Sequence, residues 1–151
     1  MCDLKDNIKL ADFGTTVNIK DILSEKIRNN AITYADCTCI QETFIGTPHF
    51  MSPEILKGQK YGRGVDIWAL GCTIVEMFTC KPPWHDLKVY ELCSKRESNT
   101  LPSYTLPSNI SAQARDFLKL SMNESYETRA TANELLYHSF ILIGNEVDDE
   151  V

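Results

Sequence analysis

The sequence lacks the marks of a metal-binding, secreted or membrane protein. Its six cysteines include no C-x-x-C pair and only three histidines accompany them, so zinc-ligand spacing is missing and we expect reduced thiols. The most apolar stretch, Val65 to Phe78, is interrupted by Asp66 and Glu76 and is shorter than the ~20 residues that span a bilayer. No apolar segment follows a basic start at the N-terminus. We therefore expect no membrane partner and a cytoplasmic location.

Positive charge is also scarce. The chain has 15 Lys and Arg against 21 Asp and Glu, which gives a formal net charge of −6. A protein that binds nucleic acid or an anionic membrane normally shows a basic patch, so we expect neither partner. The 151 residues, 43% hydrophobic and 24% charged, are typical of a globular protein with one core.

The N-terminal third combines a strand pattern with a long polar loop. Ile8, Leu10 and Phe13 follow a Lys-Asp-Asn turn signal, and their alternation with polar residues predicts a short half-buried strand or hairpin remnant. Residues 15–45 lack sustained periodicity, apart from a near-helical spacing between Ile19 and Ile27. This segment predicts a short amphipathic helix inside a long loop, and loops of that length are usually functional.

The middle third predicts two helices. Ser52-Pro53-Glu54 supplies an N-cap, a first-turn proline and a first-turn acid, and Gly58 supplies a stop. Residues 65–79 are apolar on nearly all sides, so we expect that helix to be the axis of the core, surrounded by other elements. Two prolines, at 82 and 83, end it.

The last third predicts three more helices and makes the fold mainly α. Residues 86–96 form a weaker amphipathic candidate. Ser111 can cap a helix with a buried face of Ala114, Phe117 and Leu118. Thr131 and Glu134 form a capping box that opens the last helix, whose apolar side is expected to hold Leu135, Leu136 and Phe140.

Asp12-Phe13-Gly14 is a weak motif alone, since a turn residue, a core residue and a bend would explain it equally well. Its order and spacing relative to later motifs make it specific; these are Gly46-Thr47-Pro48, Met51-Ser52-Pro53-Glu54, Asp66-Ile67-Trp68 with Gly71, Pro82-Pro83-Trp84, and Arg129. Over about residues 3 to 141 the chain resembles the eukaryotic protein kinase family. Within that family it looks most like the mitogen-activated protein kinase kinase kinases.

This resemblance implies the fold and the activity. Residues 1–141 would be a partial protein kinase domain, the C-terminal helical lobe of an α+β fold with a long activation loop, and residues 142–151 would be an acidic C-terminal tail. Kinases of this kind transfer the γ-phosphate of ATP to serine or threonine of protein substrates. The implied partners are ATP, an upstream activating kinase and a protein substrate such as a MAP kinase kinase.

The resemblance also implies site residues. Asp12 would hold the Mg²⁺ that bridges the nucleotide phosphates, with Phe13 and Gly14 beside the cofactor and Phe13 packed inward. Thr47 and Pro48 would face the substrate, and the threonine is typical of serine/threonine kinases.

Five further residues have implied regulatory or structural roles. Thr43, with Thr38 as second choice, matches a position that is phosphorylated in this group, although an ordinary solvated threonine explains it as well. Glu54 and Arg129 correspond to a buried ion pair. Asp66 resembles the residue that accepts hydrogen bonds from the backbone of the catalytic loop.

Three motifs of the family are absent from these residues: the Gly-rich phosphate loop, the strand lysine and the His-Arg-Asp loop. The general base would lie in the last of these, so no catalytic residue is assigned, and we expect the chain alone to be inactive. A truncated interaction module using the surface around Trp84, or a pseudokinase, remains an alternative. Asp12 favours the kinase fragment over a binding module, which has no need of a magnesium ligand.

Overall fold

The computed structural model describes residues 8–16, 46–59, 61–88, 91–92 and 102–146. The chain divides into two units, residues 1–37 and 38–151, and each is described by itself. The helix predicted near residues 19–27, the two regulatory threonines Thr38 and Thr43, and most of the predicted loop lie outside the described residues.

The described part of the first unit is one short 3-10 helix, η1 (Phe13–Thr15). The backbone N–H of Thr16 closes it by donating to the carbonyl of Phe13 at 3.0 Å. Of the predicted short strand, a single bridge residue, Ile8, is present, and the expected burial is wrong, because the side chains of Ile8 and Leu10 are 83% and 87% exposed. A strand is half-buried only where other elements cover one of its faces, and these side chains are not covered.

Helix α3 (Gly64–Thr79) is the longest element of the second unit and confirms the helix predicted over residues 65–79. It ends at Cys80, a residue in the left-handed conformation with φ 57°, whose N–H donates to the carbonyl of Glu76 at 2.7 Å. Lys81 and two prolines follow, so the chain turns away before it could continue as a helix.

One side of α3 is buried and the other is not. Trp68, Cys72 and Val75 lie in the core, whereas Leu70 is 42% exposed and Met77 is 71% exposed. The expectation that other elements surround this helix is therefore wrong for the chain as it stands. The composition of α3 shows how apolar the helix is, but it does not show how many other elements pack against it.

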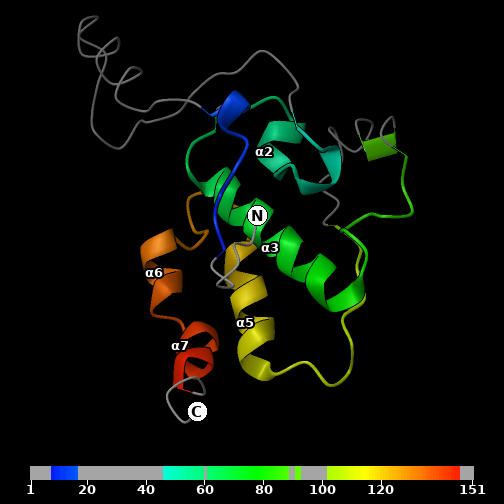
Figure 1. Cartoon of the computed structure of the whole chain (residues 1–151). Coiled ribbons are helices and arrows are strands. Elements are labelled where there is room, and N and C mark those ends of the chain that lie inside the picture. The colour runs from blue at the N-terminus through cyan, green and yellow to red at the C-terminus, as the bar shows by residue number, and fades with distance from the viewer. Residues whose placement is uncertain (1–7, 17–45, 60, 89–90, 93–101, 147–151) are drawn as a thin grey trace, which may run out of the picture. The chain divides into compact units, whose positions relative to one another are not determined.

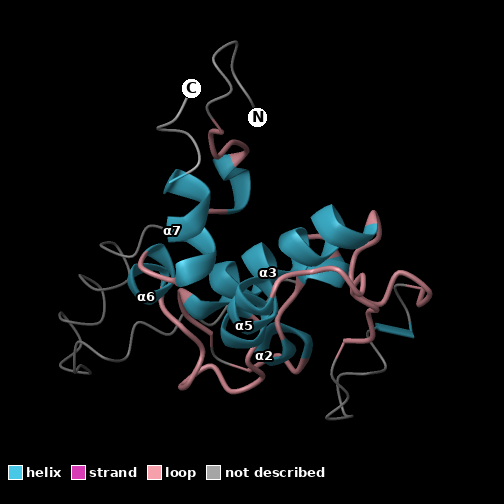
Figure 2. Ribbon diagram, turned by 90° about the horizontal axis from the view of Figure 1, so that it is seen from below, coloured by secondary structure: helices cyan, strands magenta, loops and turns pink. Residues whose placement is uncertain are grey.

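Helix α5 (Ala112–Ser121) covers the buried side of α3, and Figures 1 and 2 show the two helices side by side. The hydroxyl of Ser111 caps α5 by accepting from the N–H of Ala114 at 3.1 Å, as predicted. The core between the helices consists of Trp68, Cys72, Val75, Leu118 and Met122.

The predicted last helix is two helices, α6 (Ala132–Leu136) and α7 (Ser139–Glu146). The capping box of Thr131 and Glu134 is present, and Leu135 is buried. Leu136 is exposed, against expectation, because the helix ends there. The domain boundary expected after residue 141 falls inside α7.

His138 joins the start of α7 to α5. Its Nδ1 accepts from the N–H of Phe140 at 3.1 Å, and its Nε2 lies 3.2 Å from Asp116 Oδ2 on α5. Its ring stands edge-on to Phe117, with 5.4 Å between the ring centroids. These contacts add a polar link to the apolar packing of Phe140 on Phe117 that docks α7 on α5.

Helix α2 (Pro53–Leu56) confirms the short helix predicted after Ser52, with Gly58 just beyond it at φ 62°. The Ser52 hydroxyl does not cap α2 and is buried without a hydrogen-bond partner. Of the candidate helix 86–96, residues 91 and 92 are helical, and residues 93–96 lie outside the described part. The described chain is thus mainly helical, as expected. None of its helices is both long and apolar enough to cross a bilayer.

Gly71 sets the distance between α3 and α5. A Cβ atom built there would lie 2.5 Å from Met122 Cγ and 2.7 Å from Ser121 Oγ. Gly71→Ala should therefore force the helices apart and lower the free energy of unfolding by about 1–3 kcal/mol, measured by urea denaturation.

Gly64→Ala is the matched control in the same helix. The nearest atom to a Cβ at that position is Arg129 Nη1 at 3.5 Å, an ordinary contact. Because alanine is the better helix former, we expect no loss of stability there. Equal unfolding free energies for the two variants would contradict the close approach at Gly71.

Candidate functional site

The predicted substrate segment is a short turn in the second unit. Thr47 is the N-cap of the 3-10 helix η2 (Pro48–Phe50) and is exposed, with extended backbone angles. The N–H groups of Phe50 and Met51 donate to the carbonyls of Thr47 and Pro48 at 3.0 and 3.1 Å. Gly46 before it has φ 121°, which only glycine adopts readily. The turn thus presents Thr47 to solvent on a defined backbone.

Two contacts hold this turn against the rest of the unit. Met51 is buried in a cluster with Leu56, Trp84 and Leu92. On the other side, the imidazole Nε2 of His49 lies 3.3 Å from the carbonyl oxygen of Leu87. The loop that follows α3 therefore contacts the predicted substrate segment, which the sequence pattern did not indicate.

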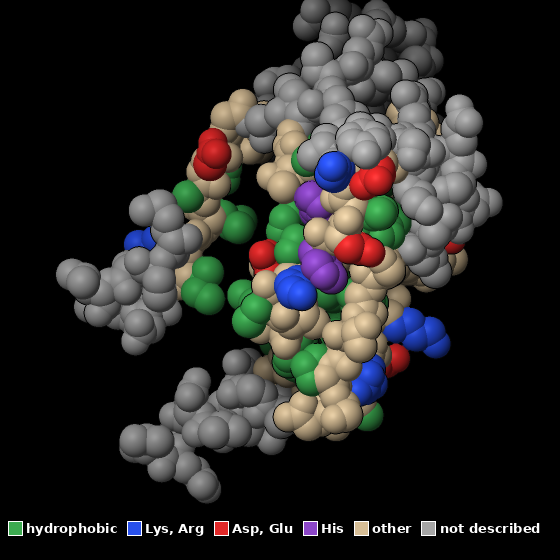
Figure 3. Space-filling model, turned by 90° about the vertical axis from the view of Figure 1, so that its right-hand side faces the viewer, with side chains coloured by type: hydrophobic (Ala, Val, Ile, Leu, Met, Phe, Trp, Pro, Cys, Tyr) green, Lys and Arg blue, Asp and Glu red, His purple; other side chains and the backbone are tan. Residues whose placement is uncertain are grey.

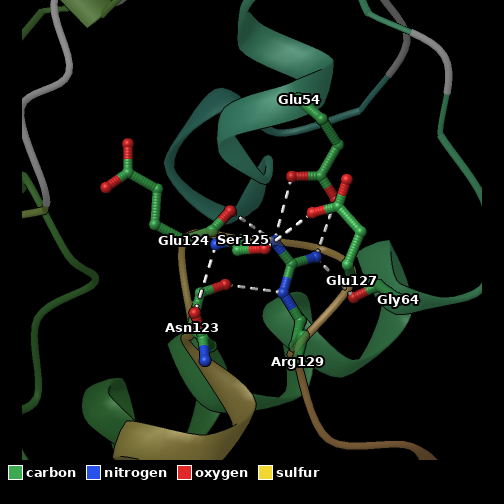
Figure 4. Close-up of polar contacts among 7 residues, drawn as sticks. All are labelled: Glu54, Gly64, Asn123, Glu124, Ser125, Glu127 and Arg129. Carbon is green, nitrogen blue, oxygen red and sulfur yellow. Dashed lines mark hydrogen bonds and ion pairs between the residues drawn. The ribbon is translucent and has the colours of Figure 1, made fainter.

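The ion pair expected from the resemblance is present. Arg129 Nη1 donates to Glu54 Oε1 at 2.7 Å, and Nη2 donates to Oε2 at 3.0 Å. Figure 4 shows the guanidinium facing the carboxylate of α2 in this two-pronged arrangement. Both side chains are almost fully buried, so the bonds form away from water. Such paired charge-assisted bonds fix orientation as well as distance.

The remaining donors of Arg129 bind backbone carbonyls. Its Nε donates to Asn123 O at 2.9 Å, and Nη1 also donates to Gly64 O at 2.9 Å. Nη2 makes a longer bond to Glu124 O at 3.5 Å. The guanidinium also lies 5.1 Å from the centroid of the Trp68 ring. One side chain thus joins α2, the start of α3 and the loop before α6.

Asp12, Phe13 and Gly14 belong to the first unit. Asp12 precedes η1 in the left-handed conformation, with φ 63°. That conformation is uncommon outside glycine, and such residues cluster at functional sites. Phe13 is 64% exposed, so the inward packing expected of its ring is wrong for the chain as it stands.

Asp12 suits a magnesium ion as a single ligand. Its carboxylate is exposed and offers the oxygen atoms that Mg²⁺ prefers. Magnesium is usually held by one or two carboxylates together with waters and substrate phosphates. Within the described ranges, no three His, Cys, Asp or Glu residues gather as a complete ion site. Asp12 therefore fits as one ligand of a metal ion that other groups also hold.

Asp66 has no partner in the described part of the chain. It lies in the first turn of α3 and is exposed, yet partial loss of water around its carboxyl raises its pKa above the ordinary value of 3.8. A carboxylate that is partly dehydrated and unpaired is a natural acceptor for backbone N–H groups.

Two cysteines fall in the described part, and both are free thiols. Burial raises the pKa of Cys72 to about 12, which makes it an inert core residue. Cys80 is exposed. Both agree with the expectation of reduced thiols.

Comparison with known proteins shows the family. The sequence-family model of the protein kinase domain matches residues 1–141 of this chain. The chain belongs to the protein kinase domain family, which confirms the resemblance found from the motifs.

The curated relatives are kinases of two named groups. The chain is 35% identical to mitogen-activated protein kinase kinase kinase A of Dictyostelium discoideum, over 100% of this chain and 14% of the relative. It is 39% identical to human mitogen-activated protein kinase kinase kinase 3, over 91% of this chain and 20% of the relative. It is 34% identical to mouse serine/threonine-protein kinase 10, over 91% of this chain and 13% of the relative. The chain thus spans a fifth or less of the length of these relatives.

Removing one partner of the buried pair should be costly. Glu54→Gln leaves the guanidinium charge of Arg129 buried without its counter-ion, and we expect a loss of about 3–5 kcal/mol in unfolding free energy. Urea denaturation at low and high salt measures it, and the loss should change little with salt because the pair is buried.

Glu124→Gln provides the control. Glu124 pairs with Lys57 at 3.6 Å in a partly exposed position, and its carbonyl bond to Arg129 survives the substitution. The expected loss is at most about 1 kcal/mol and should shrink in salt. A Glu54→Gln loss no larger than this would show that the pair does not hold the unit together.

Asp66→Asn should remove a small electrostatic penalty that the partly dehydrated carboxylate imposes on the folded state. A carboxyl whose pKa is raised by folding adds stability below its unfolded value of 3.8 and loses that contribution as the pH rises through the folded value. The variant should therefore be slightly more stable than the parent at pH 7, by less than about 1 kcal/mol given the exposure. The two should converge below pH 3.8. A variant that is less stable at neutral pH would contradict the dehydration of Asp66.

Proposed function

We propose that this chain is the C-terminal helical part of a serine/threonine protein kinase domain that phosphorylates a MAP kinase kinase in the cytoplasm. In the complete domain it supplies the magnesium ligand, the substrate segment and the helices that hold this segment. The proposal rests on membership of the protein kinase family and on the names of its mitogen-activated protein kinase kinase kinase relatives.

One observation supports the substrate role most directly, namely the bidentate bond between Glu54 and Arg129. Glu54 lies six residues after Pro48, so its fixation at α2 limits how far the η2 turn can move. Phosphoryl transfer depends mostly on positioning, and a positional error of about 1 Å can cost 100-fold in rate. A buried anchor a few residues after the exposed Thr47 and the half-buried Pro48 is suited to that requirement.

Asp12 would hold Mg²⁺ on the nucleotide, with Phe13 and Gly14 beside it. When bound, the metal neutralises charge on the transferring phosphate. Asp66 would accept hydrogen bonds from the backbone of a catalytic loop, which matches its raised pKa and its lack of a described partner. An upstream kinase would phosphorylate Thr43 or Thr38.

The 151 residues alone would be inactive, because they contain no strand lysine, phosphate loop or His-Arg-Asp base. The test is a chimera in which the part of the human mitogen-activated protein kinase kinase kinase 3 domain that carries these motifs is joined in front of residue 8. With Mg-ATP and a MAP kinase kinase, we expect phosphate on Ser or Thr from the chimera and none from the chain alone.

Variants of the chimera locate the roles. Asp12→Asn should lower kcat by about 100-fold or more, since the metal contributes several kcal/mol in the transition state. Lys119→Gln, an exposed change on α5, should leave kcat and KM unaltered. Transfer by the chain alone would overturn the claim of inactivity. A folded chimera without transfer would favour the pseudokinase or the interaction module instead.

A further inference from the structure

A pocket lies at the C-terminal end of α3, in the second unit. Its volume is about 450 Å³, and it is lined by Thr79, Lys81, Pro82, His85, Asp86, Ser103, Tyr104 and Thr105. Figure 3 shows a face of the molecule on which histidine side chains lie close to acidic and basic ones. None of the lining residues belongs to the segment assigned to substrate or to magnesium.

The walls of the pocket are built into the core. The N–H of Trp84 donates to the carbonyl of Ser103 at 3.1 Å, which ties the loop after α3 to the segment before α5. Trp84 is buried, and Pro83 before it is fully buried. Tyr104 packs against the cluster between α3 and α5. The backbone that carries the lining side chains is therefore fixed from both sides.

The loop that supplies Lys81 is also strained. It is bracketed by Cys80 with φ 57° and Trp84 with φ 55°, both non-glycine residues in the left-handed region. A bulky residue rarely adopts this conformation unless its surroundings impose it, and such strain concentrates at ligand sites. The strain places Lys81 and His85 on the same short loop beside the pocket.

Most polar side chains that line the pocket have no hydrogen-bond or ion-pair partner among the described residues. No hydrogen bond or ion pair of the described chain engages the ammonium of Lys81, the imidazole of His85, the carboxylate of Asp86 or the hydroxyls of Ser103, Tyr104 and Thr105. The exception is Thr79, whose hydroxyl lies 2.8 and 2.7 Å from the carbonyl oxygens of Val75 and Lys81 and shares its one proton between them. Six polar groups without partners around one pocket indicate a polar ligand.

Donors outnumber acceptors among these groups. The hydroxyl of Tyr104 keeps its proton at neutral pH and can donate, and burial raises its pKa further above the ordinary value of 10.0. Among the described lining residues, one ammonium, one imidazole and three hydroxyls accompany a single carboxylate. The C-terminus of α3 adds partial negative charge, but that effect is weaker than a charge-assisted hydrogen bond, and Thr79 already satisfies one of its end carbonyls.

We propose that this pocket binds a phosphomonoester, with the ammonium of Lys81 as the charged donor and the imidazole of His85 and the hydroxyls of Ser103, Tyr104 and Thr105 as further donors. The pocket is far larger than a phosphate group, so a phosphorylated side chain fits with part of its peptide. Asp86 opposes the anion and weakens binding. The site is separate from phosphoryl transfer, so it does not depend on the proposed kinase activity.

The test is calorimetric binding to the full 151-residue chain. The probes are a five-residue Gly-Gly-phosphoserine-Gly-Gly peptide, the same peptide without phosphate, and inorganic phosphate. We expect the phosphopeptide to bind, inorganic phosphate to bind more weakly, and the unmodified peptide not to bind. If inorganic phosphate binds as tightly as the phosphopeptide, the claim that the peptide is also held is overturned.

Three variants test whether the pocket binds a phosphomonoester or a different kind of ligand. Lys81→Gln should weaken phosphopeptide binding by about fivefold through the loss of one charge-assisted bond. Asp86→Asn should tighten it by about threefold, because a repelling charge is removed. Lys119→Gln, an exposed lysine outside the pocket, should change nothing.

The Asp86→Asn variant decides the sign of the ligand charge. Weaker binding in this variant would mean that the carboxylate holds a cation, and the proposal would be wrong. Equal effects of Lys81→Gln and Lys119→Gln would likewise overturn it. All three substitutions are at exposed positions, and far-UV circular dichroism checks that each variant keeps the helix content of the parent.

Discussion

The second unit depends on the buried bond between Glu54 and Arg129. The two residues are 75 positions apart, and the bond closes a loop that contains α3 and α5. Burying two charges is costly unless geometry and further hydrogen bonds compensate. Arg129 meets that condition because its other donors reach carbonyls of Asn123, Gly64 and Glu124. Lysine could not replace it, since a single ammonium lacks the planar fork that bonds two oxygens of one carboxylate.

The anchor and the pocket at the end of α3 are both connected to the η2 turn. The anchor holds α2 and so the η2 turn. His49 of that turn contacts the carbonyl of Leu87, which follows the strained segment Cys80–Trp84. Only one loop therefore separates the pocket residues Lys81 and His85 from the predicted substrate turn. The structure offers a short physical connection between the proposed phosphomonoester site and the segment around Thr47.

The local elements could be predicted from sequence because local chemistry determines them. The Ser111 cap, the capping box of Thr131 and Glu134, and the extent of α3 all follow from neighbouring residues. Predictions that needed distant neighbours failed, as with the burial of Phe13 and the covering of Leu70. The carbonyl partners of Arg129 had no sequence signal either, because a backbone acceptor is present at every residue. The ordered motifs still gave the family correctly, since their joint spacing records the whole fold.

The open side of α3 links two properties that are usually treated apart. Asp66, Leu70 and Met77 are spaced by four and seven residues, so they lie along one stripe of the helix. Any surface that covers the two apolar side chains must also remove water from the carboxyl. Covering this stripe therefore also sets the protonation state of Asp66. If the covering surface is apolar and has no hydrogen-bond donors, the carboxyl takes up a proton when that surface binds.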